Sequence, residues 1–254
     1  MFDFSAFSPV DLLPFIAIGF AAQLVDGALG MAFGVISSTL LVTLGLPPAA
    51  ASAGVHTAES FTTAVSGISH VAYRNVDWRL FARLVLPGMA GGIAGAYLLV
   101  NIDAETARPL VFAYLAAIGA YLLWRGLGRK MEEKKPRFIE PLGLVGGFLD
   151  AAGGGGWGPV VTSNLLVQGA NPRKVIGTVN TAEFFLTITI SATFILALGP
   201  EAFTVATAGL LLGGVAAAPL GAIAVKKLPA NRLLILVGLV LLATSLYGIW
   251  RALA

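Results

Sequence analysis

Eight apolar stretches follow one another along the chain, separated by short segments that carry most of its charge. They cover residues 10–45, 49–72, 80–100, 106–124, 139–168, 175–198, 203–225 and 232–250. Six of them have roughly 19 to 24 residues, the length that a helix rising 1.5 Å per residue needs to cross about 30 Å of hydrocarbon. The pattern predicts an all-α polytopic membrane protein.

The two remaining stretches, 10–45 and 139–168, are too long for a single crossing, and glycines interrupt each of them. The interruptions read DGALGMAFG at 26–34 and DAAGGGGWG at 150–158. A glycine cluster ends one helix and allows another to begin, because glycine adopts backbone angles that other residues avoid. Each stretch is therefore predicted to form a broken, re-entrant hairpin that enters and leaves the membrane on the same side.

The two halves of the chain repeat each other. Polar and aromatic residues coincide after a shift of 124 residues, which becomes 126 late in each half. The matches include Asp26 with Asp150, Gly34 with Gly158, Thr57-Ala58-Glu59 with Thr181-Ala182-Glu183, and Trp124-Arg125 with Trp250-Arg251. Chance similarity between apolar segments would match leucine, alanine and valine instead, so an internal duplication is predicted.

Each half then has one hairpin and three full crossings, and this odd number inverts the second half relative to the first. The predicted units are repeat 1–127, a cytoplasmic linker at 128–138 and repeat 139–254, all within one membrane domain. In this topology the cytoplasmic segments hold all 16 basic residues except Arg108 and Arg251, as the positive-inside rule requires. Both termini are expected on the extracytoplasmic side of a bacterial-type inner membrane.

The composition agrees with a lipid environment. Hydrophobic residues make up 57% of the chain and charged residues 11%, whereas soluble domains carry roughly 25% charged residues. The net charge of +3 is explained by the cytoplasmic loops, so no nucleic-acid partner is expected. The chain has no cysteine and no HExxH, GxSxG or Walker motif, which argues against an enzyme and against a metal or cofactor.

The hairpin tips are the first candidate site. The helix that follows each break begins with amide groups that have no intrahelical partner and carry about half a positive charge, so it can attract an anion. The residues expected to bind the anion there are Gly30, Gly34, Gly154, Gly155 and Gly156. The alternative is that these glycines only permit close helix packing.

Three further residues belong to these tips. Asp26 and Asp150 stand just before the glycine turns, and each either caps the second half-helix or acts as a functional acid, since aspartate is a preferred N-cap. Trp157 lies inside the second tip and is expected to line the cavity.

The second candidate site is a polar seam on the helix predicted at 49–72. Residues spaced by four and three positions share one helix face, and those of the seam are Ser52, His56, Glu59, Thr63, Ser66 and His70. The matching helix keeps Asn180, Glu183 and Thr187. The pathway is therefore expected to be wetter in the first half.

No cationic side chain is predicted at mid-membrane, so a bound anion would depend on neutral donors. The expected substrate-binding residues besides the glycines and Trp157 are Gln23, His56, Thr57, Asn180 and Thr181. A membrane-buried carboxylate is costly unless it is protonated, paired or hydrated. Glu59 and Glu183 are either proton carriers or neutral donors that hold their helices to the broken backbone, and with Asp26 and Asp150 they form the predicted coupling and gating group.

The sequence resembles the sulfite exporter TauE/SafE family. The resemblance rests on GFLDAAGGGGWGPVVTSNLL at 147–166 with NPRKVIGTVNTAEFF at 171–185, and on their first-half counterparts at 23–41 and 47–61. It implies transport of sulfite, sulfonates or related organosulfur anions, described as export and driven by an ion gradient. The first half departs from the glycine-rich pattern at Met31, Ala32 and Phe33, and at Val35 in place of a proline, which argues against two equivalent anion cradles.

The functional hypothesis is a secondary transporter that exports a small anion by alternating access with proton coupling. An anion channel and a cation/proton antiporter that uses the buried carboxylates remain the alternatives. The expected partners are a small anionic solute and the bilayer, with a homodimer left open.

Overall fold

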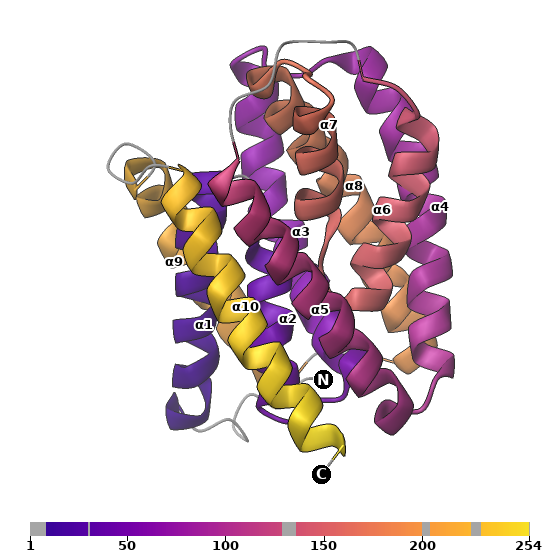
Figure 1. The fold of residues 1–254 in the computed structure, drawn as a ribbon, viewed down its shortest axis with the longest axis vertical. Coiled ribbons are helices and arrows are strands. Elements are labelled where there is room, and N and C mark those ends of the chain that lie inside the picture. The colour runs from indigo at the N-terminus through magenta and orange to yellow at the C-terminus, as the bar shows by residue number, and fades with distance from the viewer. Residues whose placement is uncertain (1–8, 30, 129–135, 200–203, 225–229, 254) are drawn as a thin grey trace.

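A computed structural model describes residues 9–29, 31–128, 136–199, 204–224 and 230–253. Within these ranges every regular element is helical (Figure 1). The elements are α1 (Pro9–Leu29), α2 (Phe33–Thr43), α3 (Pro48–Ala72), α4 (Trp78–Asn101), α5 (Ala104–Leu127), α6 (Ile139–Gly153), the π-helical turn η2 (Gly158–Thr162), α7 (Ser163–Val167), α8 (Pro172–Leu198), α9 (Val205–Ala224) and α10 (Ala230–Leu253).

Three of these helical segments are long and apolar enough to cross a membrane by themselves: Trp78–Asn101, Ala104–Leu127 and Lys174–Leu198. Shorter apolar helical segments occur in α1, α2, α9 and α10. The long helices carry exposed large hydrophobic residues such as Leu86 of α4 and Leu196 of α8, which lipid would cover. The prediction of an all-α membrane protein is confirmed.

Both long apolar stretches are broken where the glycines occur. The first break separates Leu29 from Phe33 and the second separates Gly153 from Gly158. Gly154, Gly155 and Gly156 have φ angles of 76°, 138° and 158°, which side chains with a Cβ rarely permit. The first break reaches a comparable conformation at Ala32, with φ 141°, while Gly30 lies outside the described residues.

Helices from before the linker pack mainly against helices from after it. The most extensive contacts join α1 with α9, α4 with α6, α5 with α10 and α3 with α8. Glycines make the closest of these approaches possible, because a Cβ at Gly91 or Gly95 of α4 would overlap the backbone of α6 at Leu144 or Phe148. The two halves therefore share one core instead of forming separate bundles.

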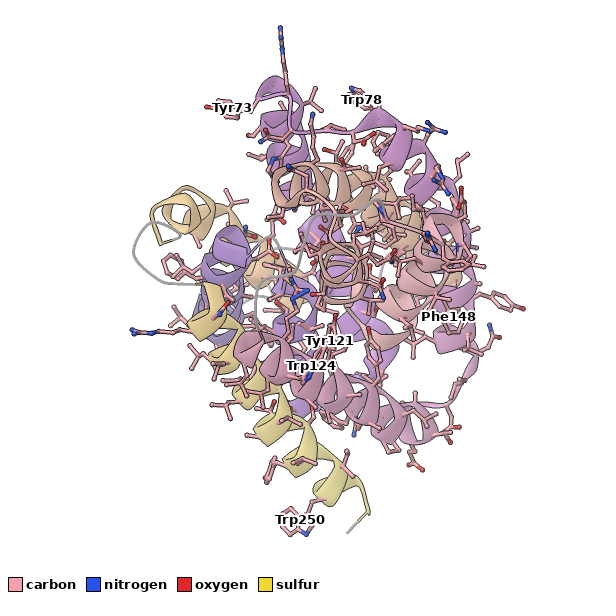
Figure 2. The ribbon with its side chains drawn as sticks, turned by 45° about the horizontal axis from the view of Figure 1, so that its top comes forward. Tyr73, Trp78, Tyr121, Trp124, Phe148 and Trp250 are labelled. Atoms are coloured by element: carbon pink, nitrogen blue, oxygen red, sulfur yellow. The ribbon has the colours of Figure 1, made fainter. Side chains whose placement is uncertain are left out.

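Tryptophans project from the ends of three helices. Trp78 begins α4, while Trp124 and Trp250 lie near the ends of α5 and α10, and all three side chains are exposed. Figure 2 shows Trp78 and Trp250 at the edge of the molecule. Amphipathic rings at helix ends are typical of the water–lipid boundary. These positions are consistent with helices that extend across the hydrocarbon.

Candidate functional site

The two backbone breaks meet inside the bundle. A Cβ added to Gly34 would lie 2.9 Å from the Cα of Gly155, so the two tips touch through their backbones. The hydroxyl of Ser38 on α2 donates to the carbonyl of Gly154, and the hydroxyl of Tyr114 on α5 donates to that of Gly155 over 3.1 Å. Side chains of the first half thus hold the broken backbone of the second.

An aspartate binds the first amide of the helix after each break. Asp150 Oδ1 accepts from the backbone N–H of Trp157 at 2.8 Å, and Asp26 Oδ1 accepts from that of Phe33 at 3.3 Å. The seven-residue spacing is the same in both hairpins. These contacts match the capping interpretation of the two aspartates, and they place a protein carboxylate where a bound anion was expected.

Asp150 also pairs with His56 of α3. Their Oδ2 and Nε2 atoms are 3.1 Å apart, and neither side chain is appreciably exposed. His56 Nδ1 lies 2.8 Å from the carbonyl oxygen of Ser52, which can only accept, so Nδ1 carries a proton. One further proton must then lie between Nε2 and Oδ2, either on an imidazolium or on a neutral carboxyl group.

The pairing of His56 with Asp150 predicts strong coupling between their substitutions. Asp150→Asn or His56→Asn alone leaves a buried polar partner unmatched and should destabilise the protein by about 3 to 5 kcal/mol. The double variant should lose less than the sum, by about 0.5 to 3 kcal/mol. Equilibrium unfolding of the four proteins in mixed micelles measures this difference, and additive losses would contradict the pair.

Glu59 and Glu183, the glutamates of the two matching Thr-Ala-Glu segments, lie beside the tips. Glu59 is 5% exposed and Glu183 is 9% exposed. The carboxylate of Glu59 contacts the backbone of Gly34, and Glu183 is close enough to Glu59, Asp26 and Asp150 to interact with them electrostatically. Four acids from both halves therefore lie near one another, and one of them, Asp150, pairs with His56.

The predicted neutral donors mostly bond within their own helices. Thr57 and Thr181 donate to the carbonyls four residues earlier at 2.8 and 2.7 Å, and Asn180 donates to that of Ile176 at 2.9 Å. Gln23 is 7% exposed, and its Oε1 has no partner among the described residues. Of this group, Gln23 is therefore the residue with a hydrogen-bonding atom left for a ligand.

Trp157 and the four consecutive glycines at 153–156, the glycine tetrad, are closely packed in this conformation. The Trp157 ring is fully buried, faces Gly88 of α4, and donates through Nε1 to the carbonyl of Val179 at 3.2 Å. A Cβ at Gly154 would meet Ser38, and one at Gly153 or Gly156 would meet Tyr114. The glycines serve close packing here, and a ligand at the tips requires them to separate.

Sequence reasoning missed Ser38 and Tyr114. Tyr114 is surrounded by apolar residues of α5, and a buried phenol usually finds an acceptor, so its presence was the available signal. No group of three or more histidine, cysteine, aspartate or glutamate side chains suited to a metal occurs in the part of the chain that the structure describes. The site is thus a cluster of acids, amides and one imidazole.

Comparisons with known proteins agree with this architecture. The family model described as Sulfite exporter TauE/SafE matches residues 15–248. A "Probable membrane transporter protein YtnM" of Bacillus subtilis (strain 168) is 42% identical over 236 residues, which cover 89% of this chain and 79% of that protein. No solved structure matches the chain.

Proposed function

The chain belongs to the sulfite exporter TauE/SafE family of membrane transporters, and on that premise we propose that it exports a small sulfur oxyanion, sulfite or a sulfonate, by proton-coupled alternating access. The observation that carries this proposal is the pair of tip contacts. Asp26 and Asp150 occupy the first amides of two half-helices that meet inside the bundle. Half-helix N-termini of this kind bind anionic groups in transporters.

The packing pattern supports two repeats related by a two-fold axis. The duplication relates α1 to α6, α3 to α8, α4 to α9 and α5 to α10. Exchanging the halves converts the α1–α9 contact into the α6–α4 contact and leaves the α3–α8 and α5–α10 contacts unchanged. Any two-fold axis that relates repeats 1–127 and 139–254 has this property. The odd number of predicted crossings in each half selects an axis in the membrane plane, and with the linker 128–138 on the cytoplasmic side both termini are extracytoplasmic.

Charge at the tips explains why protons would accompany the anion. An entering anion must displace a carboxylate from a half-helix amide, and it is repelled by Glu59 and Glu183 nearby. Protonation of these acids removes both obstacles, so the anion and protons should bind together. A dianion that leaves with one proton carries one negative charge outward, which a membrane potential negative inside favours by about 2.3 kcal/mol per 100 mV.

The test is flux in proteoliposomes that contain the purified protein. Labelled sulfite and small sulfonates should move with saturation, and an imposed proton gradient should change their rate. Flux that does not saturate and ignores the proton gradient would favour a channel. Exchange of sodium or another cation for protons, without anion flux, would favour the antiporter, for which the four clustered acids are the supporting observation.

A further inference from the structure

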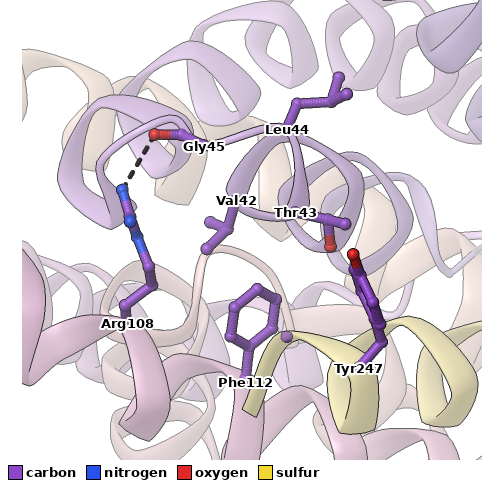
Figure 3. Close-up of a pocket in the computed structure, with 8 residues that line it drawn as sticks. Val42, Thr43, Leu44, Gly45, Arg108, Phe112 and Tyr247 are labelled. Carbon is purple, nitrogen blue, oxygen red and sulfur yellow. Dashed lines mark hydrogen bonds between the residues drawn. The ribbon is translucent and has the colours of Figure 1, made fainter. Parts of the chain in front are cut away.

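A pocket opens where the ends of three helices meet, away from the tips (Figure 3). Thr43 and Gly45 come from the end of α2, Arg108 and Phe112 from the beginning of α5, and Tyr247 from the end of α10. The cavity measures about 170 Å³. One water molecule needs roughly 10 to 15 Å³ of such space, so a small oxyanion fits with part of its hydration shell.

The length of α2 gives the depth of this pocket. The helix has 11 residues and begins at the first tip, so it rises about 16 Å. Half of the hydrocarbon thickness is about 15 Å. If the tips lie at mid-membrane, the pocket lies at the membrane surface on the side where the first hairpin begins and ends, which is the extracytoplasmic side in the proposed topology.

Arg108 supplies a charge that no described carboxylate neutralises. Its terminal nitrogen donates to the carbonyl of Gly45 over 2.9 Å, which Figure 3 shows as a dashed line. Its Nε is buried without a partner. The ion pairs between described residues are His56–Asp150 and Arg83–Glu140, neither of which involves it. A guanidinium presents several donors in a planar fork that suits oxyanions, and a ligand here would satisfy the unused ones.

The opposite side of the pocket offers a second donor. The hydroxyl of Tyr247 lies beside that of Thr43, across the cavity from Arg108, and the ring of Phe112 lies between the two sides (Figure 3). Thr43 donates its own proton to the carbonyl of Thr39 at 2.7 Å, so its oxygen is left to accept. Of the two hydroxyls, that of Tyr247 is therefore the one whose proton can be donated to a bound anion.

We propose that this pocket is an outer-face binding site for the transported sulfur oxyanion, held between the Arg108 guanidinium and the Tyr247 hydroxyl. The inference rests on the proposed function, because it assigns the site to the exported solute after that solute leaves the tips. The pocket adds a full positive charge that the tips lack. A solute released from the acid cluster would meet attraction in place of repulsion, about 16 Å further out.

A purely structural role for Arg108 makes a different prediction, and the chain offers a matched control. Arg125 near the other end of α5 also donates to one backbone carbonyl of the segment that follows a tip, that of Ser163 at the start of α7, over 2.8 Å. A purely structural role of either arginine would be to hold its backbone carbonyl by a charge-assisted hydrogen bond. Arg108→Gln and Arg125→Gln remove the same charge and the same kind of bond, but only Arg108 lines the pocket.

The experiment is exchange of labelled sulfite in proteoliposomes of neutral phosphatidylcholine, with external sulfite varied and the orientation of the protein determined. Arg108→Gln should raise the external concentration for half-maximal exchange by about 10- to 100-fold, as expected for a charge-assisted hydrogen bond. Arg125→Gln should leave that concentration unchanged. Equal effects of the two substitutions would overturn the proposal, because loss of the bond to the backbone carbonyl would then explain both.

A second variant guards against a folding defect. Tyr247→Phe keeps the bond between Arg108 and Gly45 and removes one neutral donor, so it should raise the same concentration by about 2- to 10-fold. An unchanged value in this variant together with an unchanged value in Arg108→Gln would overturn the proposal. A lipid phosphate has similar chemistry, so the series is repeated with phosphatidylglycerol added. Dependence on Arg108 that appears only in those vesicles would assign the pocket to a headgroup and overturn the solute site.

Equilibrium binding separates this inference from the proposed function. Sulfite is titrated into wild-type protein and Arg108→Gln in a neutral detergent. Binding that depends on Arg108, in a protein that shows no sulfite or sulfonate flux, would reject the transport proposal and keep the outer site. Saturable flux, with sulfite affinity and half-maximal concentration equal in wild-type protein and Arg108→Gln, would keep the transport proposal and reject the outer site.

Discussion

Combined replacement of Glu59 and Glu183 by glutamine is expected to abolish flux driven by a proton gradient and to leave some solute exchange. Glutamine has nearly the shape of glutamate but cannot bind or release a proton. Both carboxylates are buried beside the meeting tips, where an ionised acid is costly. Without these two titratable groups the tips should still admit the anion, since neutral amides repel it less, but Glu59 and Glu183 could no longer carry protons during the change of access.

Flux with and without a gradient, measured on the same vesicles, checks this expectation. Glu140→Gln is the matched control, because Glu140 is an exposed acid paired with Arg83 over 2.8 Å at the rim of the bundle. This control should keep gradient-driven flux. Full gradient-driven flux in the Glu59→Gln, Glu183→Gln protein would rule out a proton-carrier role and leave the two residues as neutral donors.

Gly155→Ala is expected to disrupt the meeting of the tips. Gly155 has φ 138°, and a Cβ there would overlap the backbone of Gly34 and Val35. The unfavourable conformation costs about 1 to 2 kcal/mol and overpacking about 1 to 3 kcal/mol. The variant should therefore lose about 2 to 5 kcal/mol of unfolding free energy, and its anion flux with it, because it can no longer bring the two tips together as the transport proposal requires.

Gly45→Ala is the control that measures the cost of backbone strain without a steric clash of the new Cβ. Gly45 has φ 102°, but a Cβ added there meets no atom within 4 Å. Its loss should be limited to the conformational cost, about 1 to 2 kcal/mol. Unfolding in mixed micelles compares the two variants. If Gly155→Ala is no less stable than Gly45→Ala and transports normally, close contact between the tips is not required.

The sequence predicted the helices well because their limits follow from local chemistry. The stretch 49–72 became α3 at Pro48–Ala72, and the breaks fell within DGALGMAFG and DAAGGGGWG. The polar seam also lies on one face, with Ser52 and His56 buried while Phe61 and Val65 on the opposite face are exposed. These features can be predicted because each depends on neighbouring residues: the length of an apolar stretch, the spacing of polar residues along a helix, and the positions of glycines.

Contacts between the halves could not be predicted in the same way. His56 was expected to bind substrate, and Asp150 either to cap a helix or to act as a functional acid, but the 3.1 Å contact between them joins residues 94 positions apart. No local pattern states which side chain of one half faces which of the other. The close filling of the glycine tetrad by Ser38 and Tyr114 has the same origin, because it depends on the depth at which α2 and α5 pass the second hairpin.

The packing of first-half helices against second-half helices has a consequence for biosynthesis. α1 packs mainly against α9, which begins roughly 180 residues after α1 ends. At about 5 to 20 residues per second, the ribosome needs some 10 to 35 s to produce that partner. During this interval α1 must be held by lipid or by the insertion machinery, and a protein truncated before α9 should be a substrate for membrane proteases.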